Sequence, residues 1–322
     1  MIEKVKAYFE TPALSQSEIK AILKGPHLVK IVEKNPYFFE ESEAMLIGSL
    51  VDDIFSHNVD ELNQKYYVGE IAEKPSDNIV SILRNVYKTR TSDDLFHQKD
   101  FIVEYANKLG YGKGKYSDDR IYNDVIKSLD YWHSILKMGE RTLVSAEEFD
   151  LANKIVHNIK NHEYTKNIMF LKAHTFQVDL YFEYQELKCK ALLDLVVYDE
   201  KTHTIYPYDF KTTGYNTMFH VVANKLNYPI QAVWYLLAIH KNRDVIADIF
   251  KIKNDFEIGE FRFITESTNN PGIPLVYSLS DETISKAQDD IDKGVELYKW
   301  HKEKDIWNIS KEVYESGGQL CI

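Results

Sequence analysis

Cysteine is scarce in this chain, which contains only Cys189 and Cys321. Two cysteines are too few for a four-cysteine zinc or iron–sulfur site, and they imply no framework of disulfide bonds. We therefore expect no iron–sulfur cluster. The chain also lacks the glycine-rich fingerprints that bind nucleotide phosphates. The absence of a P-loop and of a dinucleotide motif predicts no nucleotide cofactor and disfavours an ATP-driven motor.

Long apolar runs are absent as well. No stretch reaches the roughly 20 apolar residues that a membrane-spanning helix needs, and residues 1–10 carry four charges where a secretion signal is apolar. No internal repeat, low-complexity run or Pro/Gly/Ser-rich linker divides the chain. These absences predict a compact, cytoplasmic protein without a membrane partner, folded as a single domain over residues 1–322.

Positive charge is also in deficit, since the formal net charge is −11. Phosphate binding draws much of its affinity from Lys and Arg, so this balance argues against a protein that coats nucleic acid over its whole surface. A local cationic lining would still suffice for DNA binding. Two segments could supply it, and their candidate DNA-binding residues are Arg84, Lys88 and Arg90 in the first and Lys113 and Lys115, beside flexible glycines, in the second.

The sequence pattern predicts mainly helices in the N-terminal half and strands in the C-terminal half, which indicates the α/β class. Ser15 and Glu18 form a capping-box pattern, and Gly25-Pro26 would end that helix. Further helices are expected at 26 to about 36, 41–57, 76–108, 117–137, 146–161 and 281–302. Strands are expected at 175–184, 188–198, 204–212, 245–251, 259–265 and 275–279. The helices at about 70–150 are interpreted as an insertion.

Two acidic residues in the strand region carry the functional argument. Asp194 lies within the apolar run Ala-Leu-Leu-Asp-Leu-Val-Val, where a carboxylate is costly without a partner. Asp209 and Lys211 are two apart in the next strand and project from the same face. If the two strands form a hairpin, Asp194 lies opposite or diagonal to Asp209. Two carboxylates and one amine then meet, a set that suits Mg²⁺-assisted cleavage of a phosphodiester bond.

The helix that follows these strands adds polar groups. Asn227 is expected to cap it, and Pro229 fits its first turn. Gln231 and Tyr235 are four residues apart and lie on one face. An amide and a phenol in that position can hydrogen-bond a metal ligand, a phosphate or a base. Each of these residues alone is weak evidence for a functional site. Their order and spacing together favour one.

At these residues the chain resembles the PD-(D/E)XK nuclease superfamily. The order Asp194, Asp209-Phe210-Lys211, Gln231 and Tyr235 is similar to its RecB and RecE-like branch, which includes phage-type exodeoxyribonuclease VIII and is related to lambda exonuclease. The segments Leu14-Ser15-Gln16-Ser17-Glu18 and Gly48-Ser49-Leu50-Val51-Asp52 resemble the start of that domain. The resemblance implies a restriction-endonuclease-like fold, with a mixed central sheet flanked by helices.

Three positions depart from the family pattern. Relatives often place a His four residues after the helix glycine, where this chain has Asp52, and its neighbour Asp53 is an alternative replacement. Relatives also carry a Glu on the strand before the first catalytic Asp, for which Gln177 is the preferred match. Pro207 removes a ladder donor from an expected central strand, so a bend or bulge is predicted there.

The resemblance implies a Mg²⁺-dependent deoxyribonuclease, with Mn²⁺ as an alternative ion. The metal ligands would be Asp194, Asp209, the carbonyl of Phe210 and Asp52, while Lys211 positions the water and Gln231 and Tyr235 support the site. The implied role is exonucleolytic resection of duplex ends during phage or bacterial recombination and repair, with DNA, a single-strand annealing protein and further copies of the chain as partners. The alternatives are an endonuclease on the same core and a degenerate fold that acts as a DNA-binding or assembly module.

Overall fold

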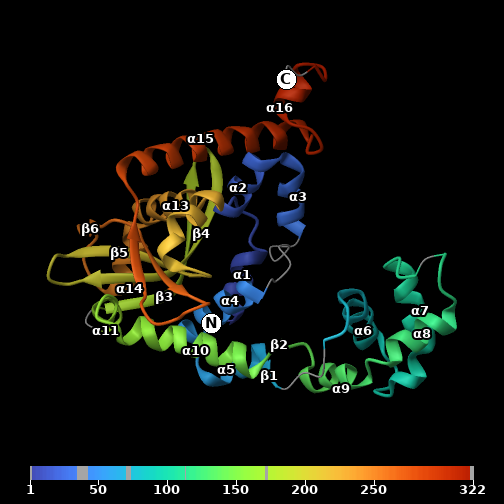
Figure 1. Cartoon of the computed structure of the whole chain (residues 1–322). Coiled ribbons are helices and arrows are strands. Elements are labelled where there is room, and N and C mark those ends of the chain that lie inside the picture. The colour runs from blue at the N-terminus through green and yellow to red at the C-terminus, as the bar shows by residue number, and fades with distance from the viewer. Residues whose placement is uncertain (1, 35–42, 70–73, 113, 171–172, 320–322) are drawn as a thin grey trace. The chain divides into compact units, whose positions relative to one another are not determined.

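A computed structural model describes residues 2–34, 43–69, 74–112, 114–170 and 173–319 of the chain. These residues form two compact units, the first from Met1–His57 with Leu151–Ile322 and the second from Asn58–Asp150. The second unit is continuous in sequence and interrupts the first. The fold is α/β, as the sequence predicts, with a mixed sheet flanked by helices in the first unit (Figure 1).

The central sheet has the strand order β3-β4-β5-β7-β8. Its strands are β3 (Ala173–Tyr184), β4 (Leu187–Asp199), β5 (Thr204–Thr213), β7 (Arg262–Ser267) and β8 (Leu275–Ser278), and the short β6 (Glu257–Ile258) also pairs with β5. The strands β3, β4 and β5 are antiparallel neighbours, whereas β5 and β7 are parallel. A parallel pair requires a crossover, and the helices between β5 and β7 provide it.

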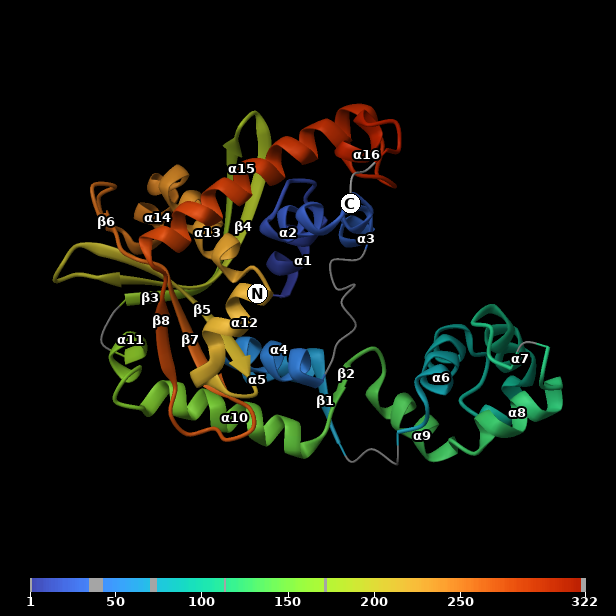
Figure 2. The same cartoon turned by 45° about the horizontal axis from the view of Figure 1, so that its top comes forward.

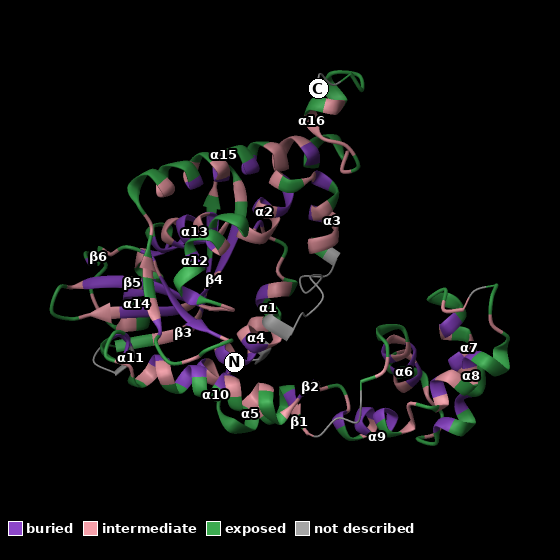
Figure 3. Ribbon diagram, viewed as in Figure 1, coloured by how far each residue is buried: buried purple, intermediate pink, exposed green. Residues whose placement is uncertain are grey.

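The helices of the first unit include long ones on both faces of this sheet (Figures 1 and 2). They are α1 (Ile2–Glu10), α2 (Gln16–Lys24), α3 (Pro26–Lys34), α4 (Glu43–Ser56), α10 (Ala146–Asn161, which begins in the second unit), α11 (Lys166–Phe170), α12 (Phe219–Lys225), α13 (Tyr228–Lys241), α14 (Arg243–Phe250), α15 (Asp281–Lys304) and α16 (Lys311–Glu315). Buried residues gather on the strands and on the inner faces of these helices (Figure 3).

Successive residues of β5 show which helices lie on which face. Phe210 stacks on Phe55 of α4, with ring centroids 4.2 Å apart, whereas the neighbouring Asp209 is hydrogen-bonded to Gln231 of α13. Because successive side chains of a strand point to opposite faces, α4 and α13 lie on opposite sides of β5. Helix α15 then packs on α13 and α2.

The N-terminal helices begin and end where the sequence predicts. Ser15 and Glu18 form a reciprocal capping box at the start of α2, and Gly25 is its C-cap. The helix from Pro26 follows directly. The predicted strands in the order β3, β4, β5 are also confirmed, each within two residues at either end.

The second unit is mainly helical and has its own apolar core. It contains α5 (Val59–Lys65), α6 (Asp77–Thr89), a 3-10 helix at Leu95–Gln98, α7 (Lys99–Lys108), α8 (Asp118–Ile126) and α9 (Leu129–Met138), with the parallel strand pair β1 (Tyr66–Val68) and β2 (Thr142–Val144). Trp132, Leu83 and Ile102 are fully buried in this core.

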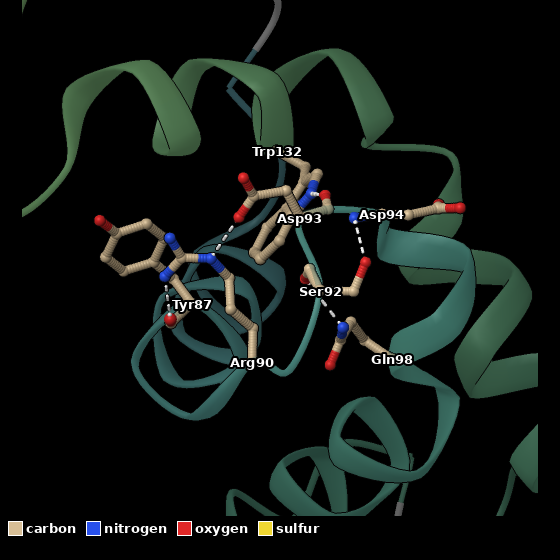
Figure 4. Close-up of polar contacts among 7 residues, drawn as sticks. All are labelled: Tyr87, Arg90, Ser92, Asp93, Asp94, Gln98 and Trp132. Carbon is tan, nitrogen blue, oxygen red and sulfur yellow. Dashed lines mark hydrogen bonds and ion pairs between the residues drawn. The ribbon is translucent and has the colours of Figure 1, made fainter.

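The helix predicted over residues 76–108 is wrong between Arg90 and Asp94 (Figure 4). The Arg90 guanidinium donates to Asp93 Oδ1 at 2.7 Å and to the Tyr87 carbonyl at 2.6 Å, and the indole of Trp132 donates to the carbonyl of Asp93 at 2.7 Å. These bonds satisfy backbone carbonyls outside a helix. The run Ser92-Asp93-Asp94 also favours a non-helical backbone, because Ser and Asp side chains compete with helical hydrogen bonds. The helix predicted over 117–137 is likewise interrupted, between α8 and α9.

One further prediction in the first unit is wrong, and another holds for the position of the residue but not for its side chain. Residues 245–251 were expected as a strand but lie mostly in α14, where Ile246 and Ala247 are buried; short apolar runs do not distinguish a strand from a helix. Asn227 occupies the N-cap position of α13 in a left-handed conformation, yet its side chain makes no capping hydrogen bond.

Pro207 produces no bulge in the pairing of β4 with β5. The register runs unbroken through Val196↔Pro207 and Leu195↔Tyr208. On the other side of β5, the pairing is interrupted between Ile205, which faces β6, and Tyr208, which faces β7. The missing donor of Pro207 therefore falls within a break between two neighbouring strands.

A helix that crosses a lipid bilayer needs about 20 mostly apolar residues. Within the described part of the chain, none combines the length and the apolar character that a membrane span requires.

Gly294 of α15 sets how closely α2 approaches. A Cβ built at Gly294 would lie 2.8 Å from Cγ2 of the fully buried Ile19. We expect Gly294→Val to lower the free energy of unfolding by about 2 kcal/mol, because the added methyl groups overpack the contact. Urea unfolding measures this change. The matched control is Lys293→Val at the exposed neighbouring position, which should cost no more than about 0.5 kcal/mol. Equal losses would show that the close approach carries no weight.

Candidate active site

The register of the sheet brings Asp194 and Asp209 together. The last recorded pair of β4 and β5 is Leu195↔Tyr208, and the same register carried one step further sets Asp194 opposite Asp209. Directly opposed residues of an antiparallel pair share a face. The two carboxylates are close enough to hydrogen-bond and to raise the pKa of Asp194. The structure thus brings together the two acids on which the sequence argument depends.

Asp209 is completely buried and is held by two groups. Gln231 of α13 donates from Nε2 to Asp209 Oδ1 at 2.6 Å, and the Lys211 ammonium forms an ion pair with Oδ2. A buried carboxylate is tolerated when its oxygens receive such partners. Asp209 and Lys211 are two residues apart in β5 and form an ion pair on one face of the strand, as the strand period predicts.

Lys211 remains an ammonium in this setting. Burial by itself lowers the pKa of the amine, but Asp209 and Asp194 outweigh that effect and the net pKa is raised. Its Nζ also donates to the carbonyl oxygen of Phe210 at 3.3 Å and lies 5.0 Å from the ring centroid of Tyr228. The amine thus contacts one candidate metal ligand, Asp209, and the carbonyl of another, Phe210.

Asp194 is the electrostatically unfavourable member of the site. Burial raises the pKa of its carboxyl well above the ordinary value, and the negative charges of Asp209 and Asp52 raise it further, with only Lys211 opposing them. Two or more carboxylates that share a site cannot all ionise cheaply unless a cation joins them. This repulsion is the feature of the site that a bound cation would relieve.

The structure separates Asp52 from Asp53 on α4. Asp53 is buried and pairs with Nδ1 of His57 at 3.4 Å, one helical turn away. Asp52 is half-buried and acts on Asp194. Helix α4 approaches β5 closely here, because a Cβ built at Gly48 would lie 3.3 Å from Oγ1 of Thr212. Of the two, Asp52 is the residue whose negative charge acts on Asp194.

Gln177 lies next to the site in a strained backbone conformation. The β3–β4 register runs through Phe176↔Leu195 and Val178↔Leu193, which sets Gln177 opposite Asp194 at a step where no pair forms. Its φ is +52°, in the left-handed region that non-glycine residues rarely adopt. Such strain costs about 1–3 kcal/mol and is concentrated at functional sites.

Gln231 and Tyr235 form the helix side of the site. Both are buried, and Gln231 Nε2 also donates to the hydroxyl of Tyr235 at 3.2 Å. Burial raises the pKa of Tyr235 well above its usual value, with Asp194 and Asp209 adding to the effect. The phenol therefore stays protonated beside the carboxylates.

Sequence reasoning missed Lys190, which attaches the N-terminal helix to β4. Its ammonium donates to the carbonyls of Tyr8, Phe9 and Thr11 at 2.9, 3.4 and 2.7 Å. These carbonyls are at the C-terminal end of α1, where a cation is favourable. The signal in the sequence is a lysine in the same apolar strand as Asp194.

A cavity of about 910 Å³ opens beside the carboxylates. Asp194 and Tyr235 reach it, and its walls come from residues 8–18, from residues 186–188, and from Tyr298 and Lys302 of α15. A substrate could approach Asp194 from this side. The cavity lies wholly within the first unit.

The residues predicted to bind DNA lie in the second unit and differ in their surroundings. Arg84, Lys88 and Lys115 are exposed. Arg90 is engaged with Asp93 and the Tyr87 carbonyl, and its guanidinium lies 4.0 Å from the Tyr87 ring centroid (Figure 4). Lys113 lies outside the described residues. The DNA-binding role of this set stays a prediction, and Arg90 has a structural task in its loop.

The donor set fits Mg²⁺ in kind. Among the described residues, no three or more His, Cys, Asp or Glu side chains come together as a metal cluster. Mg²⁺, however, is commonly held by one or two carboxylates, with waters and substrate phosphates completing its shell. The adjoining carboxylates of Asp194 and Asp209, with the Phe210 carbonyl beside them, supply hard oxygen donors, and their mutual repulsion favours a cation.

Comparisons with known proteins add little. No family model and no curated protein sequence matches the chain. Among solved structures, an exonuclease candidate from Eubacterium rectale is similar over 78% of this chain and 95% of its own, with 15% identity and a TM-score of 0.39. A likeness this distant does not bear on activity. The functional proposal therefore rests on the geometry of the site.

Replacing Asp52 should relieve the repulsion on Asp194. In the absence of divalent metal, the raised pKa of Asp194 makes the folded state lose stability as the pH rises from about 4 through that pKa. We expect Asp52→Asn to flatten this loss and to raise the free energy of unfolding at neutral pH by about 1 kcal/mol. Urea unfolding at several pH values measures it.

The matched control is Asp53→Asn, one residue along the same helix. It changes the carboxylate that contacts Nδ1 of His57 and should lower stability instead. If the two variants changed the pH profile alike, Asp52 would not be the residue that acts on Asp194.

Proposed function

We propose that the protein is a Mg²⁺-dependent deoxyribonuclease that hydrolyses phosphodiester bonds. The observation that carries the proposal is the buried Asp209, held between the Gln231 amide and the Lys211 ammonium and set against Asp194. A charged group in a buried position with this many specific partners marks a functional site. The combination of two acids and an amine also matches the resemblance to PD-(D/E)XK nucleases.

The residues that would hold the metal are Asp194, Asp209 and the carbonyl of Phe210, with Asp52 as the further ligand. When bound, Mg²⁺ (or Mn²⁺) neutralises charge on the scissile phosphate and lowers the pKa of a coordinated water. A cation held there would offset the negative charges of Asp209 and Asp52, which add to the effect of burial on the pKa of the Asp194 carboxyl.

The protein's own groups act around that centre. Lys211, kept protonated by Asp209 and Asp194, orients the attacking water and stabilises negative charge on the phosphate. Gln231 fixes the orientation of the Asp209 carboxylate. Support of this kind behind a metal ligand typically changes metal affinity or activity by about 10- to 100-fold. Tyr235 remains a neutral hydrogen-bonding group at the wall of the cavity.

The biological role proposed by resemblance is exonucleolytic resection of duplex ends in a bacterial or phage-infected cell. Products of resection are single strands, so a single-strand annealing protein is the expected partner. Self-association of the chain is part of the same proposal.

Replacing the water-positioning amine tests the activity. We expect the wild type to release nucleotides from linear duplex DNA only with Mg²⁺ or Mn²⁺, and Lys211→Ala to lower kcat by at least about 100-fold. Lys201→Ala, in the exposed turn between β4 and β5, is the matched control and should be as active as the wild type.

Two outcomes would change the assignment. Equal degradation of linear and closed circular duplex would replace the exonuclease by an endonuclease. If wild type and Lys211→Ala bind DNA alike and neither degrades any DNA substrate, the protein is a non-catalytic DNA-binding or assembly module.

A further inference from the structure

Lys20 brings a second amine to the candidate site from a different part of the chain. It lies on α2 between the buried residues Ile19 and Ala21. Its Nζ is 5.7 Å from the ring centroid of Tyr228, the same ring that Lys211 approaches at 5.0 Å. One tyrosine at the start of α13 thus contacts the amines of two elements that are far apart in sequence.

Among the residues that the structure describes, none forms a hydrogen bond or ion pair with the Lys20 ammonium, which lies near the Tyr228 ring. Asp209 attracts it, but the carboxylate of Asp209 is already bound by Gln231 and Lys211. Burial, with the positive charge of Lys211 adding to its effect, lowers the pKa of Lys20 to about 7.

Lys190 is a lysine of this protein whose ammonium has its hydrogen-bond partners. Lys190 is buried, and its ammonium donates to three backbone carbonyls. A partly buried cation without such partners is costly unless a ligand supplies them. Since the amine is a donor and not an acceptor when charged, the fitting ligand is an anion.

We propose that Lys20 binds a backbone phosphate of the DNA strand beside the scissile bond. The proposal rests on the proposed nuclease function and adds a substrate-binding residue to it. The three acids Asp52, Asp194 and Asp209 repel a polyanion, and the ammonium of Lys211 is already paired with Asp209. A second amine at the Tyr228 ring, beside Lys211, offsets that repulsion, and the phosphate in turn provides charge-assisted hydrogen bonds to the ammonium.

Its position is well defined by the fold. Helix α2 is fixed against α15 by the close approach of Ile19 to Gly294, and its first turn is fixed by the capping box of Ser15 and Glu18. The next lysine, Lys24, is at the end of the same helix and is exposed. Lys24 therefore carries the same charge on the same element without facing the Tyr228 ring, which makes it a matched control.

The test is the steady-state cleavage of a linear duplex in Mg²⁺ by wild type, Lys20→Gln, Lys20→Arg and Lys24→Gln, repeated at several salt concentrations. We expect Lys20→Gln to raise KM by about tenfold with little change in kcat, as for the loss of one charged hydrogen bond. The slope of log(kcat/KM) against log[salt] should become shallower by about 0.9, the value for one phosphate contact. Lys20→Arg should restore KM to within a few fold, and Lys24→Gln should behave as wild type.

Other outcomes would overturn the inference. An unchanged KM and salt slope in Lys20→Gln, or a fall in kcat alone, would mean that Lys20 only balances the charge of the acids. If the wild type cleaves no DNA, the nuclease function fails by itself. Equilibrium binding of the same duplex by the same four proteins then decides the role of Lys20, with the same expected order and salt slopes. Since Lys20→Gln removes a partly buried charge, it should unfold no earlier than wild type, which excludes misfolding as the cause.

Discussion

Two carboxylates that repel each other, Asp194 on β4 and Asp209 on β5, set the conditions for everything around them. The sheet register forces them together, and burial makes their charges more costly than they would be in water. The neighbouring groups offset this cost. Gln231 and Lys211 hold Asp209, while Asp194 keeps a raised pKa, which is the electrostatic condition that a bound cation would relieve.

The architecture supplies these groups from both faces of the sheet. The crossover between the parallel strands β5 and β7 places α13 on one side, so that Gln231 and Tyr235 reach the acids. On the other side, the stacking of Phe55 on Phe210 docks α4, whose Asp52 adds a negative charge that acts on Asp194. Lys190 joins α1 to the strand that carries Asp194. The amines of Lys20 and Lys211 then share the ring of Tyr228 at the first turn of α13.

Local signals in the sequence predicted those helices and strands whose ends are fixed by interactions within one helical turn or by the pattern of one strand. The capping box at Ser15 needs only Glu18, and the three strands β3, β4 and β5 need only their apolar runs and turn residues. Prediction was wrong where distant contacts decide. The loop at Arg90–Asp94 is held partly by Trp132, which lies about forty residues later in the chain, and α14 is helical because Ile246 and Ala247 are buried against the rest of the first unit.

The order of the site residues was readable in the chain, because a strand of period two puts Asp209 and Lys211 on one side and a helix of period 3.6 puts Gln231 and Tyr235 on one face. Periodicity could not separate Asp52 from Asp53, since adjacent helical residues are both compatible with a partly buried face. Only tertiary structure set Asp53 against His57 and brought the charge of Asp52 close enough to act on Asp194. The role of Lys20 was likewise decided by the tertiary structure. It depends on the nearness of Lys20 to Tyr228 and Asp209, which arises when α2 docks on α13. No local pattern of residues encodes that docking.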